Sequence, residues 1–180
     1  MTVVREDDVR WLSGLVGRAA PPEGWAEDEH LRYRLYQECL AACPSAADEE
    51  RIVEIVVRDQ DAAMAESTLV WHVDRLAPDF TTAEDFADRV STLAGQAPGF
   101  AFLQARIGQW VPVKRAEADP EGSVAAVLAG NLWLQRTIAD TSRSPVLLGV
   151  LAERGAARKL RNTAADRLRR LASAGGAASP

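Results

Sequence analysis

An internal repeat constrains the fold of this 180-residue chain more than any other feature of its sequence. The segment "PVLLGVLAERGAARKLRNTAADRLRRLA", residues 145–172, aligns without a gap beneath "ERIVEIVVRDQDAAMAESTLVWHVDRLA", residues 50–77, at an offset of 95. In both copies apolar residues recur at the spacing of one helical face, and a polar stretch interrupts them near the middle. Each copy therefore predicts a helix, a tight turn and a second helix.

The rest of the chain also has a helical pattern. Ala, Leu, Arg and Glu dominate, and no segment alternates apolar and polar residues between regularly spaced turns, as strands do. The expected helices cover residues 6–17, 26–42, 46–58, 62–77, 82–96, 100–115, 123–141, 145–154 and 157–172. We therefore expect an all-α fold with one helical domain over residues 1–172. The small, polar residues 173–180 predict a disordered tail.

Hydroxyl side chains stand where several of these helices should begin. A serine or threonine at this position can accept a hydrogen bond from an otherwise unpaired amide of the first turn. The expected N-caps are Ser45, Thr81 or Thr82, Ser123 and Ser144. Pro145 suits the first helical position, where no amide hydrogen is needed.

The segment "LRNTAADRLRRLA" resembles the second-helix signature of HEAT repeats, in which an apolar residue and an arginine precede two alanines and a pair of leucines. The offset of 95 is about twice the 40–47-residue period of HEAT and armadillo arrays. The resemblance implies an α-solenoid, a fold that serves as a scaffold for many tasks and points to no single activity. It also implies a turn aspartate and a helix arginine that join adjacent repeats.

The two copies carry only part of that ionic pattern. The last copy has Arg161 but no aspartate in its turn, whereas the first has Asp59 and Asp61 but Glu66 at the arginine position. This departure favours a short, irregular stack of antiparallel helix pairs over a regular array.

Charge is distributed unevenly along the chain. Of a net charge of −5, residues 1–142 hold 24 acidic and 13 basic side chains, and residues 143–180 hold 2 and 8. Such asymmetry can mark an acidic partner, or attraction between the two ends of one molecule.

The helix expected at 157–172 contains most of the C-terminal basic residues. Its apolar arc of about 140° predicts one buried face; the members are Leu160, Ala164, Ala165, Leu168, Leu171 and Ala172. Arg161 falls inside this arc, so we expect it to bind a carboxylate or backbone carbonyls. The remaining basic side chains fan over the other half; they are Arg158, Lys159, Arg167, Arg169 and Arg170. A fan is typical of a terminal repeat that must stay soluble, not of a helix that reads DNA.

A few other residues are candidates for binding. Trp71 points away from the apolar arc of its helix, so it either packs on a flanking helix or anchors a partner. We expect His72 to be a packed, hydrogen-bonded residue and not a general base. Polar side chains on the helix near Trp133 either line a pocket or bond between helices. The candidate binding residues are Trp71, His72, Asp74, Asn131, Trp133, Gln135, Arg136, Arg158, Arg161 and Arg169.

The sequence disfavours metal, cofactor and covalent chemistry. Cys39 and Cys43 share a helical face, but a zinc site needs four ligands and His30 is the only nearby imidazole. No HExxH motif, phosphate-binding loop or Ser–His–Asp arrangement occurs. No apolar run of about 18 residues predicts a membrane span, and the N-terminus lacks a signal core. Two cysteines suit a reducing compartment, so we expect a cytoplasmic protein.

Three functions fit these features. The first is a small, non-enzymatic protein-binding module of the adaptor, regulatory or immunity type. The second is a nucleic-acid-acting protein that resembles the HEAT-like alkylpurine DNA glycosylases, with Trp71, Trp110, Trp133 and Asp74 beside the C-terminal arginines. Residues 1–142 would repel phosphates, which disfavours it. The third is a biosynthetic enzyme or carrier that holds an apolar small molecule between helices. We expect the partner to be another protein.

Overall fold

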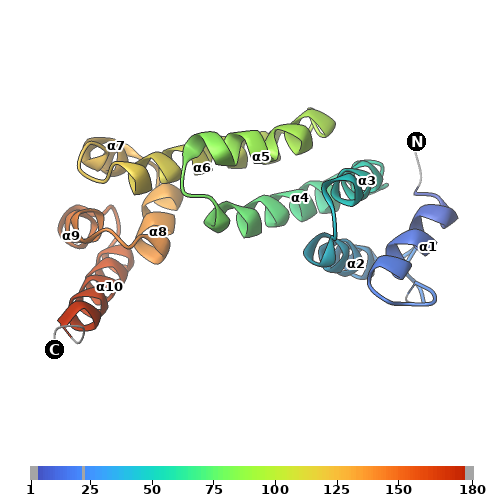
Figure 1. The fold of residues 1–180 in the computed structure, drawn as a ribbon, viewed down its shortest axis with the longest axis horizontal. Coiled ribbons are helices and arrows are strands. Elements are labelled where there is room, and N and C mark those ends of the chain that lie inside the picture. The colour runs from blue at the N-terminus through green and yellow to red at the C-terminus, as the bar shows by residue number, and fades with distance from the viewer. Residues whose placement is uncertain (1–3, 22, 177–180) are drawn as a thin grey trace. The chain divides into compact units, whose positions relative to one another are not determined.

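A computed structural model describes residues 4–21 and 23–176 of the chain, and Figure 1 shows them as a succession of helices. The described residues contain no strand, which confirms the predicted all-α fold. The α-helices are α1 (Glu6–Leu15), α2 (Glu29–Ala42), α3 (Ala46–Val57), α4 (Ala62–Leu76), α5 (Ala83–Gln96), α6 (Ala101–Ala118), α7 (Val124–Ala129), α8 (Leu132–Thr141), α9 (Pro145–Arg154) and α10 (Arg158–Gly176). A short 3-10 helix, η1 (Ala77–Asp79), follows α4.

The chain forms two compact units. Unit 1 comprises Met1–Asp79 and Asp88–Ile107, and unit 2 comprises Phe80–Ala87 and Gly108–Pro180. Helices α5 and α6 therefore contribute residues to both. The single domain expected over residues 1–172 stays a prediction, because two compact units can belong to one domain.

Unit 1 is a stack of helix pairs in two layers. In the first layer, Arg51 of α3 lies 4.0 Å from the centre of the Trp11 ring on α1. Gln96 of α5 donates to the Glu50 carbonyl of α3 over 3.2 Å. In the second layer, α2 packs against α4, and α4 contacts the N-terminal part of α6. Fully buried apolar side chains fill the core of this unit; they include Leu35, Ile52, Val56, Leu69, Val73 and Leu103.

The turn between α3 and α4 is held by a buried aspartate. One oxygen of Asp59 accepts hydrogen bonds from Arg32 Nε at 3.1 Å and from the Tyr36 hydroxyl at 2.8 Å. The other oxygen accepts from the amide of Asp61 at 2.9 Å. Burial, followed by the charge of Asp59, raises the pKa of Tyr36 above its usual value, so the phenol remains a donor. The turn aspartate thus bonds an arginine, as the HEAT resemblance implies, but the arginine comes from α2.

Glu66 has a different role from the arginine that occupies its position in the last copy. Its Oε1 accepts hydrogen bonds from the amides of Phe102 at 2.7 Å and Leu103 at 3.1 Å. These amides lie in the first turn of α6, where no intrahelical acceptor exists. The carboxylate therefore caps α6 from the neighbouring helix pair, and its negative charge suits the positive end of the helix dipole.

Unit 2 contains α7–α10 and an aromatic cluster. Helix α9 packs against α10 and α8, and α8 also packs against α10 and α7. Trp110 lies between Phe86, with ring centres 6.5 Å apart, and Trp133, with ring centres 5.4 Å apart in an edge-to-face arrangement. Buried aliphatic residues complete the core; they include Leu134, Ile138, Leu147, Leu148, Leu151 and Leu160.

The single helix predicted over residues 123–141 is wrong, because the chain is extended at Gly130 and Asn131. The side chain of Asn131 caps α8 by accepting from the amide of Leu134 at 2.9 Å. Gln135 donates to the carbonyls of Leu128 and Gly130, which lie at the end of α7. Two side chains thus stabilise a break that the apolar periodicity does not reveal.

The other predicted helix ends differ less. Ser45, Thr82 and Ser144 accept from amides of the following first turns, as expected. Ser123 makes no such bond; instead Asp119 accepts from the amide of Gly122, so this N-cap prediction is wrong. Helix α10 continues to Gly176, past the predicted end at residue 172. Residues 177–180 of the predicted tail lie outside the described residues.

The apolar face of α10 is narrower than predicted. Leu160 and Ala164 are buried, Ala165, Leu168 and Leu171 are half-buried, and Ala172 is exposed. Arg161 donates to the Gly155 carbonyl over 2.7 Å, which confirms the expected carbonyl contact. Arg167 is not part of an exposed fan, because it donates to the Ser142 carbonyl over 2.9 Å. Gly155 and Ser142 directly follow α9 and α8, where carbonyls have no intrahelical partner, so both can accept from a guanidinium group.

Candidate functional site

Five side chains on α4 and α6 form a surface that combines aromatic rings with arginines. Trp71, Asp74 and Arg75 share one side of α4 because they are three and four residues apart. Phe102 and Arg106, one turn apart, share one side of α6. We call these five side chains the α4–α6 face. All of them belong to unit 1.

Short contacts fix the members of the α4–α6 face. Arg106 Nη1 lies 2.9 Å from Asp74 Oδ2, and this ion pair joins the two helices. The Arg106 guanidinium also lies 5.4 Å from the centre of the Phe102 ring. Arg75 lies 5.7 Å from the centre of the Trp71 ring, and its Nη2 donates to the Leu40 carbonyl of α2 over 3.0 Å. Both arginine–ring distances are within the range of cation–π interactions.

The α4–α6 face exposes apolar area to solvent. Phe102 is 52% exposed, more than any other large apolar side chain of the described residues. Trp71 is half-buried, and Arg75 is exposed. Tryptophan and arginine are the residue types that most often dominate binding energy at protein interfaces. The face can therefore bind an apolar side chain through its rings and a carboxylate through the exposed Arg75.

His72 is buried on an adjoining side of α4, and its ring centre lies 6.5 Å from that of Trp71. Its Nε2 lies 2.6 Å from Glu49 Oε1 on α3, and Arg89 of α5 bonds the other oxygen of Glu49. The expectation that His72 is packed and hydrogen-bonded is confirmed. It joins α4 to α3 beneath the α4–α6 face and does not belong to that surface.

The Glu49 cluster should make the stability of the protein sensitive to acid. Burial alone would raise the pKa of Glu49, but hydrogen bonds from His72 and Arg89 outweigh it and hold the pKa below its usual value of 4.5. A carboxyl with a lowered pKa stabilises the folded state above the pKa of the unfolded chain, and this contribution is lost as the pH falls through the lower value. We expect Glu49→Gln to lower the free energy of unfolding at pH 7. The difference from the unsubstituted protein should shrink below about pH 4.5.

Urea denaturation of the unsubstituted protein and of Glu49→Gln between pH 3 and pH 7 measures this difference in the free energy of unfolding. Glu50→Gln, which removes an exposed neighbouring carboxylate, is the matched control. A Glu49→Gln effect that stays constant over this range would contradict the predicted role of its charge.

The candidate residues of α8 and its N-cap mainly form hydrogen bonds and ring contacts within the chain. Asn131 caps the helix, and Gln135 adds a third bond by accepting from the amide of Ala156 at 2.9 Å. Trp133 is half-buried against Trp110, and Arg136 is exposed. The sequence left two alternatives for these polar side chains: they line a pocket, or they form hydrogen bonds between helices. The contacts of Gln135 fit the second alternative.

The basic candidates on α10 do not gather into one site. Arg158 and Arg169 are exposed, and Arg169 pairs with Asp166 on the same helix. Arg161 binds the Gly155 carbonyl. The structure thus brings Trp71 and Asp74 together on one face, with His72 beneath, and places the other candidates in unit 2.

Sequence reasoning missed Arg75, Phe102 and Arg106. Arg75 could have been found, because it lies four residues after Trp71. Phe102 and Arg106 show the same spacing, but their proximity to Asp74 depends on how α6 packs against α4. That packing has no local signal in the sequence.

The cysteines do not fit a nucleophilic or metal site. Burial raises the pKa of Cys39 to about 12 and also raises the pKa of Cys43, so both thiols are protonated at neutral pH. Cys39 is buried as expected, whereas Cys43 is half-buried. Within residues 4–21 and 23–176, no three His, Cys, Asp or Glu side chains are placed to hold a metal ion.

Among the described residues, none of the helices combines the length and the hydropathy that a bilayer span requires. Comparisons of the chain with protein-family models, curated proteins and solved structures found no match.

Proposed function

We propose that the protein is a non-enzymatic binding module of the adaptor, regulatory or immunity type, and that a partner protein docks on the α4–α6 face. The observation that carries this proposal is Phe102, a 52% exposed aromatic ring held beside Arg106. Leaving such a ring in water forgoes the free energy of burying it, which binding to a partner recovers. The two free cysteines support a cytoplasmic location.

The charge of the face indicates the chemistry of the partner. Arg106 is only 14% exposed and is paired with Asp74, whereas Arg75 is exposed, so Arg75 is the charged group of the face that a partner can reach. Arginine binds carboxylates through paired hydrogen bonds and also stacks on rings. The partner should therefore present an apolar side chain flanked by aspartate or glutamate.

Site-specific crosslinking in the native host tests the proposal. A photoreactive phenylalanine analogue at position 102 should capture a partner that the same analogue at position 146 does not. Val146 on α9 is the matched control, because it is also a large exposed apolar residue, at 38%. Each captured protein is then purified and its affinity for the unmodified chain is measured.

Substitutions then relate that affinity to the α4–α6 face. We expect Phe102→Ala and Trp71→Ala each to weaken binding at least about tenfold, as truncation of an interface hot spot does. Val146→Ala should change it less than about twofold. A partner that binds all variants equally would contradict the proposal. Tight binding of duplex DNA at about 150 mM salt would favour the nucleic-acid alternative instead, because nonspecific binding is weak there.

A further inference from the structure

Arg75 belongs both to the α4–α6 face and to a pocket beside that face. The pocket has a volume of about 330 Å³, which lies within the range of ligand-binding pockets. Its walls come from the C-terminal ends of α2 and α4, the turn between α2 and α3, the start of α3, and Arg89 of α5. All of the lining residues are described, and all belong to unit 1.

The pocket and Phe102 lie on opposite flanks of Trp71. Successive residues of an α-helix are about 100° apart around its axis, so Arg75 lies about 40° to one side of Trp71 and Asp74 about 60° to the other. Asp74 is bonded to α6, the helix that carries Phe102, whereas Arg75 is bonded to the Leu40 carbonyl of α2. A partner that covers Trp71 can therefore reach the ring on one flank and the pocket on the other.

Both arginines of the pocket keep N–H donors that a ligand can reach. Arg75 is exposed, and only its Nη2 is used, for the Leu40 carbonyl at 3.0 Å. The Arg89 side chain is 35% exposed, and its Nη2 is bonded to Glu49. Its Nε and Nη1 have no partner among the described residues, and neither atom is enclosed. A guanidinium with free N–H groups can hold a carboxylate through paired hydrogen bonds.

The charges of the pocket favour an anion. Its lining contains the guanidinium groups of Arg75 and Arg89 and the carboxylate of Glu49, whereas Asp48 does not line it. The Glu49 side chain is only 10% exposed, and its two oxygens are bonded to His72 and Arg89. Among the described residues, Arg75 contacts a backbone carbonyl and an aromatic ring but no carboxylate. The accessible charge in the pocket is therefore positive.

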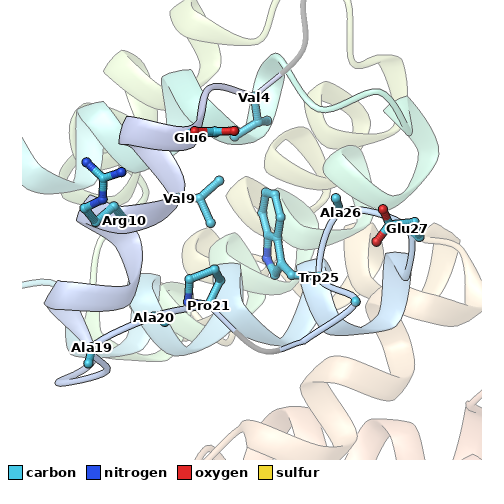
Figure 2. Close-up of a pocket in the computed structure, with 11 residues that line it drawn as sticks. Val4, Glu6, Val9, Arg10, Ala19, Ala20, Pro21, Trp25, Ala26 and Glu27 are labelled. Atoms are coloured by element: carbon cyan, nitrogen blue, oxygen red, sulfur yellow. The ribbon is translucent and has the colours of Figure 1, made fainter.

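Another pocket of unit 1 lacks this preference. Figure 2 shows it between α1 and the loop that follows, with Val9 and the Trp25 indole on facing sides. Its arginine, Arg10, is paired with Asp7 at 3.2 Å, and two glutamates also line it. The charges of that pocket do not select an anion, as those beside Arg75 do.

Apolar groups form the wall opposite the charges. Leu40 and Leu76 come from α2 and α4, and the exposed residues Ala41 and Pro44 extend this wall to the surface. The methylene groups of an acidic side chain can pack on it while the carboxylate meets the arginines, and burial of each methylene is favourable. Hydrogen bonds to α2 and α3 already hold both guanidinium groups, which lowers the ordering cost of binding.

We propose that this pocket receives an aspartate or glutamate side chain of the partner that docks on the α4–α6 face, and that Arg75 and Arg89 bind its carboxylate. The apolar side chain of the partner then contacts Trp71 and Phe102, and its acidic side chain lies on the other flank of Trp71. The proposal rests on the proposed function for the source of the carboxylate. It adds Arg89 and the position of the acidic side chain to that function.

Two capped amino acids of nearly the same shape test the pocket without the partner. N-acetylglutamate N-methylamide presents its carboxylate as a protein does, whereas N-acetylglutamine N-methylamide presents a neutral amide. In a nitrogen-15-labelled full-length chain, Arg75→Lys and Arg89→Lys assign the Nε–H resonances of the two arginines. We expect the glutamate probe to shift both resonances in a saturable manner. It should bind at least about threefold more tightly than the glutamine probe, because charge-assisted hydrogen bonds are stronger than neutral ones.

Matched variants locate the site. Arg89→Gln should weaken the glutamate probe at least about threefold, whereas Arg34→Gln, which removes an exposed arginine outside the pocket, should not. Ala41→Leu should fill part of the pocket and weaken both probes, whereas Ala42→Leu alters an exposed neighbour outside the lining and should not. The alanine variants test the location even if Arg89→Gln fails to fold. Equal affinities of the two probes, shifts confined to other arginines, or absence of saturable binding would each overturn the proposal.

The partner captured at position 102 separates this proposal from the proposed function. Arg89→Gln should weaken its binding at least about threefold, and Arg34→Gln less than about twofold. If Phe102→Ala weakens binding of the partner but Arg89→Gln does not, the docking face stands and the pocket proposal is overturned. If the glutamate probe binds but position 102 captures no partner, the docking function is overturned together with the partner as the source, and a free carboxylic acid becomes the occupant.

Discussion

Asp59→Ala will lower the free energy of unfolding by about 3 to 5 kcal/mol, the range for breaking a buried ion pair by removing one partner. The Asp59 side chain is 1% exposed and that of Arg32 is 5% exposed, so water cannot replace the lost carboxylate. The substitution would also remove the acceptor of the Tyr36 hydroxyl and of the Asp61 amide. Three donors would then remain buried, or half-buried in the case of Asp61.

Denaturation in urea, followed by circular dichroism, measures this effect. The matched control is Asp166→Ala, which breaks the exposed pair with Arg169 and should cost under about 0.5 kcal/mol. Asp59→Asn keeps an acceptor without the charge and should fall between the two. If Asp59→Ala and Asp166→Ala had equal effects, the turn aspartate would not be the anchor of the α3–α4 turn.

Trp110→Ala should cost a similar 3 to 5 kcal/mol, as truncation of a buried aromatic residue usually does. Trp110 is 5% exposed and packs against Phe86 and Trp133, and the ammonium group of Lys114 lies 5.6 Å from its ring centre. Removal of the indole would leave a cavity among side chains that come from three helices. Such a cavity closes poorly, because each neighbour is held by its own helix.

The same denaturation experiment checks this second prediction, with Phe102→Ala as its control. Phe102 is half exposed, so its truncation should change stability by less than about 1 kcal/mol. A large loss of stability in Phe102→Ala would contradict its assignment to a surface, and would also mean that its binding experiment reports on folding.

The sequence predicts the helices of this protein well, because apolar periodicity and turn residues act over short distances. It fails at Gly130 and Asn131, where the apolar pattern continues through a break. The bonds from Gln135 that stabilise this break reach residues five and seven positions away, so they depend on the folded chain and not on helix propensity. The hydrogen bond from Arg167 to the Ser142 carbonyl could not be predicted from local sequence either, because it spans 25 residues.

The candidate site could be predicted only in part, for a similar reason. The helical angles identify Trp71 as a residue off the buried arc, and the structure places it on the α4–α6 face. The sequence does not single out Phe102, because nothing in its neighbourhood distinguishes it from a core phenylalanine. Only the packing of α6 beside α4 shows that it is exposed.

The cap that Glu66 forms on α6 bears on how fast a partner can bind. The amide of Phe102 is held by this carboxylate at 2.7 Å, so the backbone that carries the exposed ring is ordered before any encounter. Association with a preorganised residue needs no prior rearrangement, and its rate is then set by diffusion and orientation. Loss of the cap in Glu66→Ala would weaken this order and would appear as slower association, while the ring itself stays unchanged.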